Sequence, residues 1–246
     1  MTAKKSTGVG TLTGGLLGLL LTLSCLITAF WFSWHGLAQI NFGYSLGYKM
    51  LHIDQHIQHY GPSNRYRDNF ELTSYDQHQQ LFSDIVSAIQ QGGAGLAQIT
   101  YTTPDQTTST LLREAEVIHL QDVANLITLF NQTALGSLIL LLILAGVYRW
   151  QKKPPPTLKH IATGTLIALT VIGLGLLIAG PTSAFYWLHT KVFPDDHQWF
   201  FYYQESLMTT LMKAPDLFGF IAALWAVVAL SLFGLGQWAL LKLLKA

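Results

Sequence analysis

Charged residues are scarce in this sequence, and so is cysteine. Only 11% of the 246 residues are charged, whereas 50% are hydrophobic. A soluble domain carries about 25% charged residues, so this composition excludes a soluble globular protein and indicates a membrane protein. Cys25 is the only cysteine, which excludes an internal disulfide even in an oxidising compartment.

The apolar stretch around Cys25 has two interpretations. It begins after Lys4 and Lys5, as the apolar core of a secretory signal with a lipid-attached cysteine does. The run, however, continues to Trp34, which makes it longer than the core of a cleaved signal. We therefore expect a first transmembrane helix here, and a lipoprotein signal remains the alternative.

Four apolar runs are long enough to cross a bilayer. A helix rises roughly 1.5 Å per residue and needs about 20 residues for the hydrocarbon core. The runs cover residues 11–34, 125–148, 161–180 and 217–240. The sequence therefore predicts an all-α membrane protein with four transmembrane helices. Residues 35–124 would form a small extracytoplasmic α(+β) cap, and residues 181–216 an outer aromatic loop.

The distribution of charge orients these helices. Lysine and arginine gather at the N-terminus, between the second and third runs, and at the C-terminus, where there is no Asp or Glu. Cytoplasmic segments of membrane proteins carry such an excess of basic residues. We therefore expect both termini in the cytoplasm and all 13 acidic residues on the outer face.

The predicted cap contains helical and strand patterns. Ser74 precedes Gln77 by three residues, which is a capping-box pattern, and apolar residues then follow at helical spacing until Gly92. Residues 96–103 are typical of a short strand followed by a turn. We expect Ser109 to cap a second helix, which carries His119 and continues into the second span.

The stretch GYSLG around Ser45 matches the nucleophile elbow of serine hydrolases. That elbow requires a strand, a sharp turn and a helix within a large parallel sheet. A predicted cap of roughly 90 residues beside a membrane helix cannot supply such a sheet. We therefore interpret the match as chance.

A second motif, HIDQHIQH, carries three histidines. His52, His56 and His59 would share one face of a helix, and imidazoles placed in this way can bind zinc or copper. A solvated or interfacial helix face explains the same spacing. We expect no metal site, and metal binding remains the alternative.

The stretch that leads into the second span contains a histidine between carboxylates. Glu116, His119 and Asp122 follow one another in steps of three, so on a helix they share a face. A carboxylate that accepts a hydrogen bond from an imidazole raises its basicity, as in a general base. Arg113 precedes this group by one turn. The alternative is a polar helix end where the chain leaves lipid.

Residues 185–203 hold nine aromatic residues together with His189 and His197. Aromatic residues gather at membrane interfaces in general. The density is high even for such a belt, so we expect an aromatic pocket over the bilayer surface. Its predicted lining is Trp187, Phe193, Trp199, Phe200 and Tyr202.

The last two groups of residues resemble motifs of the lipoprotein intramolecular transacylases. The motifs are EVIHLQDV before a membrane helix, LHTKVF followed by a tryptophan and further aromatics, and PDLF at the last helix. The resemblance implies four transmembrane helices under an extracytoplasmic cap and two catalytic histidines, His119 and His189. The spacing from His189 to Trp199 is longer than the family pattern, so His197 remains a rival for the second position.

The resemblance also implies a reaction and its partners. The substrate would be a lipoprotein whose N-terminal cysteine carries diacylglycerol on sulfur, and the enzyme would move the sn-2 acyl chain to the cysteine amine. Arg113, Glu116 and Asp122 would support the histidines, and no cofactor is needed. We expect a monomer in the bacterial inner membrane, with membrane lipid but no nucleic acid as a further partner.

Two other classes of function stay open on the sequence. One is a non-catalytic envelope protein that binds metal or senses a signal through His52, His56 and His59. The other keeps the fold but acts as an acyltransferase or hydrolase on another outer-leaflet lipid.

Overall fold

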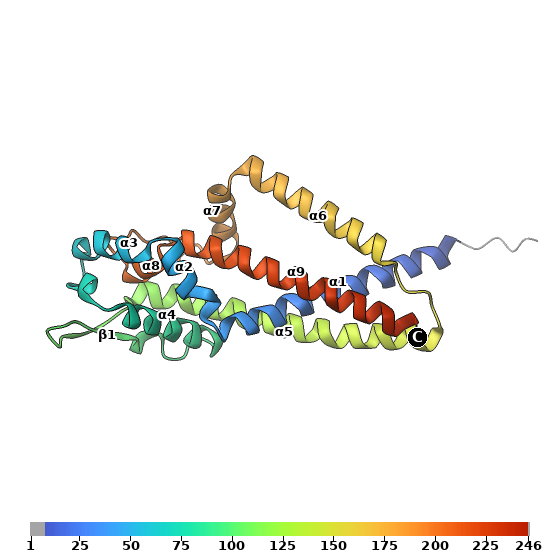
Figure 1. Cartoon of the computed structure of the whole chain (residues 1–246), viewed down its shortest axis with the longest axis horizontal. Coiled ribbons are helices and arrows are strands. Elements are labelled where there is room, and N and C mark those ends of the chain that lie inside the picture. Colours follow the sequence, from blue (N-terminus) through green and yellow to red (C-terminus); the bar gives the residue numbers. More distant parts are fainter. Residues whose placement is uncertain (1–7, 246) are drawn as a thin grey trace, which may run out of the picture. The chain divides into compact units, whose positions relative to one another are not determined.

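A computed structural model describes residues 8–245 of the chain. Four helices are long and apolar enough to cross a membrane: α1 (Gly8–Ala38), α5 (Glu114–Gln151), α6 (Leu158–Ala179) and α9 (Asp216–Lys245). The other elements are α2 (Tyr44–Met50), α3 (Ile53–Tyr60), α4 (Tyr75–Gln90), α7 (Pro181–Val192), α8 (Leu207–Met212) and the strands β1 (Thr100–Thr102) and β2 (Thr108–Thr110) (Figure 1). Four membrane helices and one small hairpin confirm the predicted fold class. Lys4 and Lys5 lie outside the described residues.

The chain divides into two compact units, each with its own packing. The first contains the described residues up to Trp34, together with Asn131–Gly180 and the residues from Ala226 onward. Its core is apolar: Cys25, Ala29, Ile161, Phe233 and Leu241 form one buried cluster. Trp31 donates a hydrogen bond from its indole nitrogen to Asn131, so these two polar side chains satisfy each other away from water.

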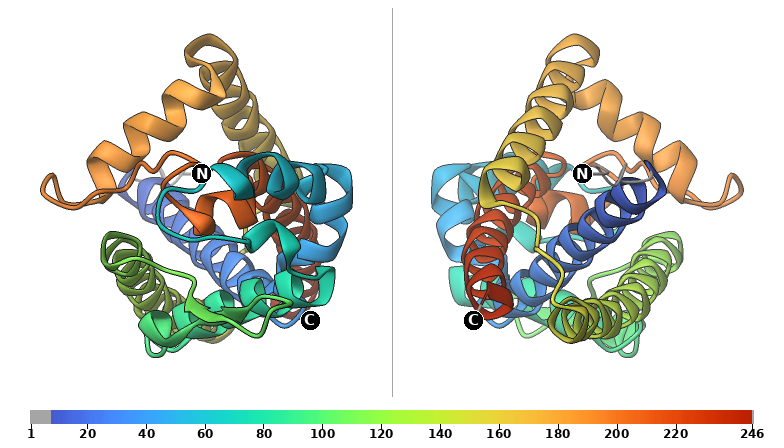
Figure 2. Two further views of the ribbon diagram at one scale, coloured as in Figure 1. Left: turned by 90° about the vertical axis from the view of Figure 1, so that its left-hand side faces the viewer. Right: turned by 90° about the vertical axis from the view of Figure 1, so that its right-hand side faces the viewer.

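The second unit contains His35–Phe130 and Pro181–Trp225, and all candidate site residues lie in it. Its core is built around Tyr44 of α2, which is fully buried and stacks on Phe82 of α4 at a ring distance of 4.1 Å. The Tyr44 hydroxyl donates a hydrogen bond to the carbonyl of Leu211 in α8. In this unit α3 packs against both α2 and α8 (Figure 2).

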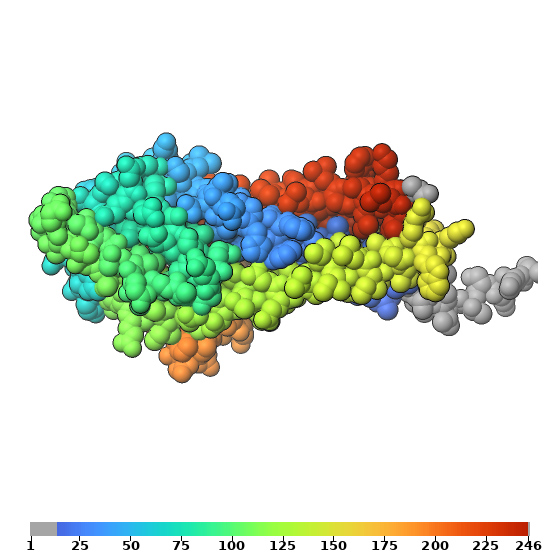
Figure 3. All heavy atoms as spheres, turned by 90° about the horizontal axis from the view of Figure 1, so that it is seen from below, coloured from blue at the N-terminus to red at the C-terminus, as the bar shows by residue number. Residues whose placement is uncertain are grey.

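The helix predicted from the capping box is α4. The Ser74 side chain accepts a hydrogen bond from the backbone N–H of Gln77, which confirms the predicted N-cap. His78, Leu81, Phe82 and Ile85 form its buried face. The segments from the end of α3 to the hairpin form a continuous surface of the second unit (Figure 3).

The predicted strand exists, but the predicted cap at Ser109 is wrong. Ser109 lies in β2 and pairs with Tyr101 of β1. The threonine-rich segment around it prefers a strand, and its pairing with β1 satisfies the backbone groups that a cap would have served. Helix α5 begins five residues later, where the carboxylate of Glu116 accepts a hydrogen bond from the backbone N–H of Arg113 at 2.7 Å.

Part of the segment expected as an aromatic loop is helical. Gly180, with φ of +81°, ends α6, and Pro181 begins α7. Glycine takes this positive φ without the steric cost of a side chain, and proline is favoured at the first position of a helix. His189 therefore lies on a helix and not in a loop.

Candidate active site

His119 and His189 lie next to each other in the second unit. Their ring centroids are 6.4 Å apart and their planes differ by 28°. His119 stands near the start of α5, and His189 stands in the last turn of α7. The structure therefore brings together two imidazoles that are 70 residues apart in the sequence.

The protonation pattern of His189 follows from its hydrogen bond. Its Nδ1 lies 2.8 Å from the backbone carbonyl of Phe185, and a carbonyl oxygen can only accept. Nδ1 therefore carries the hydrogen, and Nε2 keeps a lone pair. Burial lowers the pKa of His189 from its usual value, so the ring is neutral and able to accept a proton near neutral pH.

His119 has a different environment. Its Nδ1 atom is buried and has no hydrogen-bond partner. The ring lies 4.9 Å from Phe193 and 6.0 Å from Phe201, measured between centroids. A buried nitrogen without a partner costs free energy in the resting protein, so it is available to a substrate group that can hydrogen-bond to it.

Aromatic rings surround the two histidines. Trp199 lies 5.0 Å and Phe193 5.2 Å from the His189 ring, so these two predicted pocket residues do contact the pair. The other three predicted lining residues, Trp187, Phe200 and Tyr202, are exposed and have no ring contact with either histidine that the structure records for the described residues.

Two lining residues were missing from the predicted pocket. Phe185 lies 3.9 Å from the His189 ring, and Phe201 is 6% exposed beside His119. Phe185 stands one helical turn before His189 on α7. Its spacing of four residues from His189 was the available indication, because side chains at that spacing meet on a helix.

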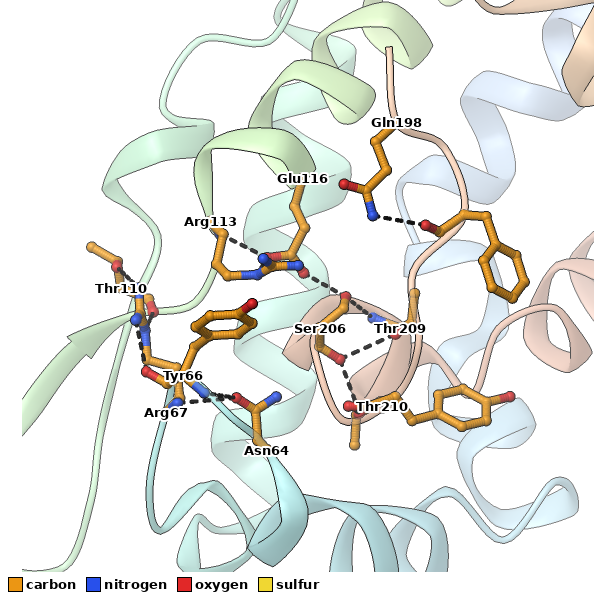
Figure 4. A network of polar contacts seen from close by, with 12 residues as sticks. Asn64, Tyr66, Arg67, Thr110, Arg113, Glu116, Gln198, Ser206, Thr209 and Thr210 are labelled. Carbon is orange, nitrogen blue, oxygen red and sulfur yellow. Dashed lines mark hydrogen bonds and ion pairs between the residues drawn. The ribbon is translucent and has the colours of Figure 1, made fainter. Parts of the chain in front are cut away.

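The two carboxylates do not hold the ring of His119 as their spacing suggested. Asp122 accepts a hydrogen bond from Nδ1 of His197 at 2.7 Å. Glu116 is fully buried and accepts the hydroxyl hydrogen of Ser206 at 2.5 Å (Figure 4). Both carboxylates share a helix with His119, but their hydrogen-bond donors come from residues distant in sequence.

The Glu116 carboxylate joins two helix starts. One oxygen accepts from the backbone N–H of Arg113, before α5, and the other from Ser206, the N-cap of α8. The Arg113 guanidinium lies 3.5 Å from Glu116 and 4.4 Å above the ring of Tyr66. Glu116 and Arg113 therefore hold the starts of α5 and α8 together, and they do not contact the His119 imidazole through a hydrogen bond that the structure records for the described residues.

The alternative motifs find little geometric support. His56 packs between the rings of Tyr60 and Tyr203, and no three His, Cys, Asp or Glu side chains of residues 8–245 gather as a metal site requires. The Ser45 hydroxyl bonds to the Tyr75 hydroxyl at 2.8 Å, with no histidine as its partner.

Comparisons with known proteins identify a fold and a family. The chain resembles the membrane integral lipoprotein intramolecular transacylase Lit from Bacillus cereus in two structures with a histidine replaced, by arginine in one and by alanine in the other. The arginine variant gives a TM-score of 0.66 at 16% identity, with 96% of this chain and 94% of that chain covered. The alanine variant gives 0.65 at 16% identity, with 98% of both chains covered.

These identities show a shared fold. No curated protein sequence matches the chain. The model of the lipoprotein intramolecular transacylase Lit family, however, matches residues 19–214, which is most of the chain. The protein therefore belongs to the lipoprotein intramolecular transacylase Lit family.

Proposed function

We propose that His119 and His189 form the acid–base pair of an intramolecular acyl transfer on a lipoprotein. The observation that carries this proposal is their ring distance of 6.4 Å. Four aromatic rings contact the pair, and we call them the aromatic enclosure: Phe185, Phe193, Trp199 and Phe201. As a member of the Lit family the protein is an acyltransferase. The substrate is a lipoprotein whose N-terminal cysteine carries diacylglycerol on sulfur and a free amine on its α-carbon.

The chemistry begins with removal of a proton from the amine. Its intrinsic pKa is roughly 7.7–8.0, so much of it is protonated near pH 7 and not nucleophilic. Nε2 of His189 has the lone pair that accepts this proton. The amine then attacks the sn-2 ester carbonyl, and the bond between the carbonyl carbon and the glyceryl oxygen breaks.

His119 serves the second half of the reaction. Its ring donates a hydrogen bond to the developing oxyanion, and it passes the proton that the attacking nitrogen loses to the departing glyceryl oxygen. The products are an amide on the cysteine nitrogen and a lyso lipid on sulfur. Atoms balance without water or cofactor, because the acyl group and one proton only change places within the substrate.

The enclosure has two tasks. It holds amine and ester together, because the medium-sized ring through which they react closes poorly in solution. It also keeps out water, which would hydrolyse the same ester. Rings such as Phe185, Phe193 and Trp199 suit both tasks, since they are rigid and apolar.

The placement in the cell follows from charge. The acidic residues and the histidine pair belong to segments that the positive-inside rule places outside. We propose a monomer in the bacterial inner membrane with both termini in the cytoplasm and the site on the outer face.

A reporter lipoprotein tests the proposal directly. Mass spectrometry of its N-terminal peptide, after expression with and without this protein, should show an N-acyl cysteine with a lyso lipid only when the protein is present. If that product is absent and another lipid loses or gains an acyl chain, the protein is an acyltransferase or hydrolase that acts on a different lipid. An unchanged lipid profile together with bound metal would favour a sensing protein.

A further inference from the structure

The chain after α7 folds back over the two histidines. We call residues 193–201 the aromatic segment, since they include Phe193, Trp199, Phe200 and Phe201. The backbone N–H of Phe193 still donates to the carbonyl of His189, so the segment starts as a continuation of α7. A turn follows, in which the N–H of His197 donates to the carbonyl of Pro194.

One side-chain hydrogen bond joins this segment to α5. Nδ1 of His197 donates to the carboxylate of Asp122 at 2.7 Å. Asp122 stands one turn after His119 on the same helix. The hydrogen bond therefore ties the aromatic segment to the element that carries one of the two imidazoles.

His197 is close in sequence to Trp199 and Phe201, two of the aromatic residues that contact the histidine pair. Trp199 is two residues after His197 and lies 5.0 Å from the His189 ring, measured between centroids. Phe201 is four residues after His197 and lies 6.0 Å from the His119 ring. The positions of the Trp199 and Phe201 side chains thus depend on where the backbone at residue 197 is held.

We infer that the His197–Asp122 hydrogen bond is a latch that positions Trp199 and Phe201 against the two histidines and thereby selects amide formation over hydrolysis. The inference rests on the proposed function. His197 is then a positioning residue, which acts through the aromatic segment without touching the reacting atoms. Its imidazole is bound to a carboxylate, whereas the His189 imidazole keeps Nε2 free.

The charges around His197 support a strong hydrogen bond. The hydrogen bond that His197 donates to Asp122, with a further electrostatic contribution from Asp196 of the same segment, raises the pKa of His197. A carboxylate acceptor makes this hydrogen bond stronger than one between two neutral groups. Asp122 of α5 and Asp196 are the charged groups that face this imidazole.

The latch matters because two nucleophiles compete for one ester. If the amine attacks, the acyl group ends on nitrogen. If water attacks, its oxygen bonds to the carbonyl carbon, the glyceryl oxygen leaves with a proton, and the products are a free fatty acid and a lyso lipoprotein with a free amine. The two outcomes differ in mass, so their ratio reports directly on water exclusion.

Three variants of the purified full-length protein test the latch on a diacylglyceryl reporter lipopeptide. His197→Ala removes the donor, Asp122→Ala removes the acceptor, and the double variant His197→Asp with Asp122→His rebuilds the pair in reverse. Asp195→Ala is the matched control, because it removes an exposed carboxylate of the same segment. Each variant is checked for folding by its thermal unfolding in detergent.

We expect both single variants to raise the ratio of hydrolysed to N-acylated product about three- to fivefold, since a solvent-accessible pair of this kind shifts an equilibrium by a factor of up to about five. The reversed pair should restore most of the wild-type ratio, and Asp195→Ala should match wild type. A structural defect alone would lower both products together and leave the ratio unchanged.

Three results would overturn the latch. The first is an unchanged product ratio in folded His197→Ala, and the second is loss of both products as complete as in His189→Ala, which would make His197 catalytic. The third is failure of the reversed pair to restore the ratio. The proposed function fails separately, when the wild-type protein forms no N-acyl product at all.

Discussion

His78 and His119, both in the second unit, differ in whether their ring nitrogens have hydrogen-bond partners. In the cap, His78 is 3% exposed, and both of its ring nitrogens have partners. Thr73 donates its hydroxyl hydrogen to the carbonyl of Phe70, so it accepts from Nε2 of His78, and Nδ1 accepts from Tyr48. In the candidate site, Nδ1 of His119 is buried without a partner.

The difference distinguishes a histidine whose two nitrogens are paired from one with an unpaired nitrogen, a feature that His119 shares with Nε2 of His56. His119 has in addition a second imidazole whose ring centroid lies 6.4 Å away. A buried polar atom without a hydrogen bond costs about 1–3 kcal/mol, and folding alone gives no reason to keep it. A satisfied imidazole such as His78 stabilises one packing arrangement. An unsatisfied one such as His119, beside a second histidine with a free Nε2, keeps its hydrogen-bonding capacity for a substrate.

The sharpest test of this comparison is removal of the site histidines. His119→Ala and His189→Ala should each lower N-acyl product formation by at least a hundredfold, because acid–base groups contribute roughly a hundred- to ten-thousandfold. Since the two act as a unit, the double variant should be little worse than either single one. Rates are measured by mass spectrometry of the reporter peptide.

The same variants should leave the fold intact. Thermal unfolding of His119→Ala in detergent should resemble that of wild type, since this substitution removes an unsatisfied nitrogen. Retained transfer in both single variants would refute the mechanism. Retained transfer in His189→Ala together with its loss in His197→Ala would move the second catalytic position to His197.

Glu116 should show the reverse pattern, with an effect mainly on stability. Glu116→Ala leaves Ser206 and the N–H of Arg113 without their shared acceptor, and breaking such a buried charged network costs about 3–5 kcal/mol. Glu116→Gln keeps one acceptor oxygen and should cost less. Unfolding midpoints of the two variants measure this, and equal midpoints to wild type would contradict the structural role.

The cap histidine predicts a dependence of stability on pH. Burial lowers the pKa of His78 to about 4, against about 6.5 in the unfolded chain. The folded state therefore binds fewer protons, and the contribution of His78 is complete above pH 6.5 and lost as the pH falls toward 4. The full loss would be about 3 kcal/mol.

His78→Gln serves as the control, because an amide retains hydrogen bonds but does not titrate. Its unfolding midpoint should change less between pH 7 and pH 4.5 than that of wild type. The opposite outcome, a steeper dependence in His78→Gln, would show that His78 does not lower stability in acid.

The apolar runs and the periodicity predicted the fold class, but not the partners of the site carboxylates. The four apolar runs and the cap of α4 are local features, and local features are readable from spacing. The spacing of Glu116 and Asp122 from His119 was equally local, yet their partners are Ser206 and His197, which are 90 and 75 residues away. Contacts between residues so far apart depend on the path of the folded chain, and a short stretch of sequence does not specify that path.

The hairpin shows the same limit on a smaller scale. Ser109 is a good helix cap by residue type, and only its pairing with β1 decides that it belongs to a strand. Phe185 and Phe201 were two of nine rings in one segment, and sequence alone did not tell which of them would turn toward the histidines.

The smallest expected effect concerns Ser45, a hydroxyl that resembles a nucleophile only in its sequence context. Ser45 shares its hydrogen bond with the exposed Tyr75 hydroxyl, and its helix α2 is entered from Gly43 in a left-handed conformation, not from a strand. Ser45→Ala should therefore change transfer by no more than about threefold, and stability by about 0.5 kcal/mol or less, as for most surface substitutions. Tyr75→Phe, which removes the other hydroxyl of the pair, is the matched control and should behave alike. A loss on the order of a thousandfold in Ser45→Ala alone, the size expected for a triad serine, would mean that the ester is attacked by the enzyme first and that the histidine pair serves a covalent intermediate.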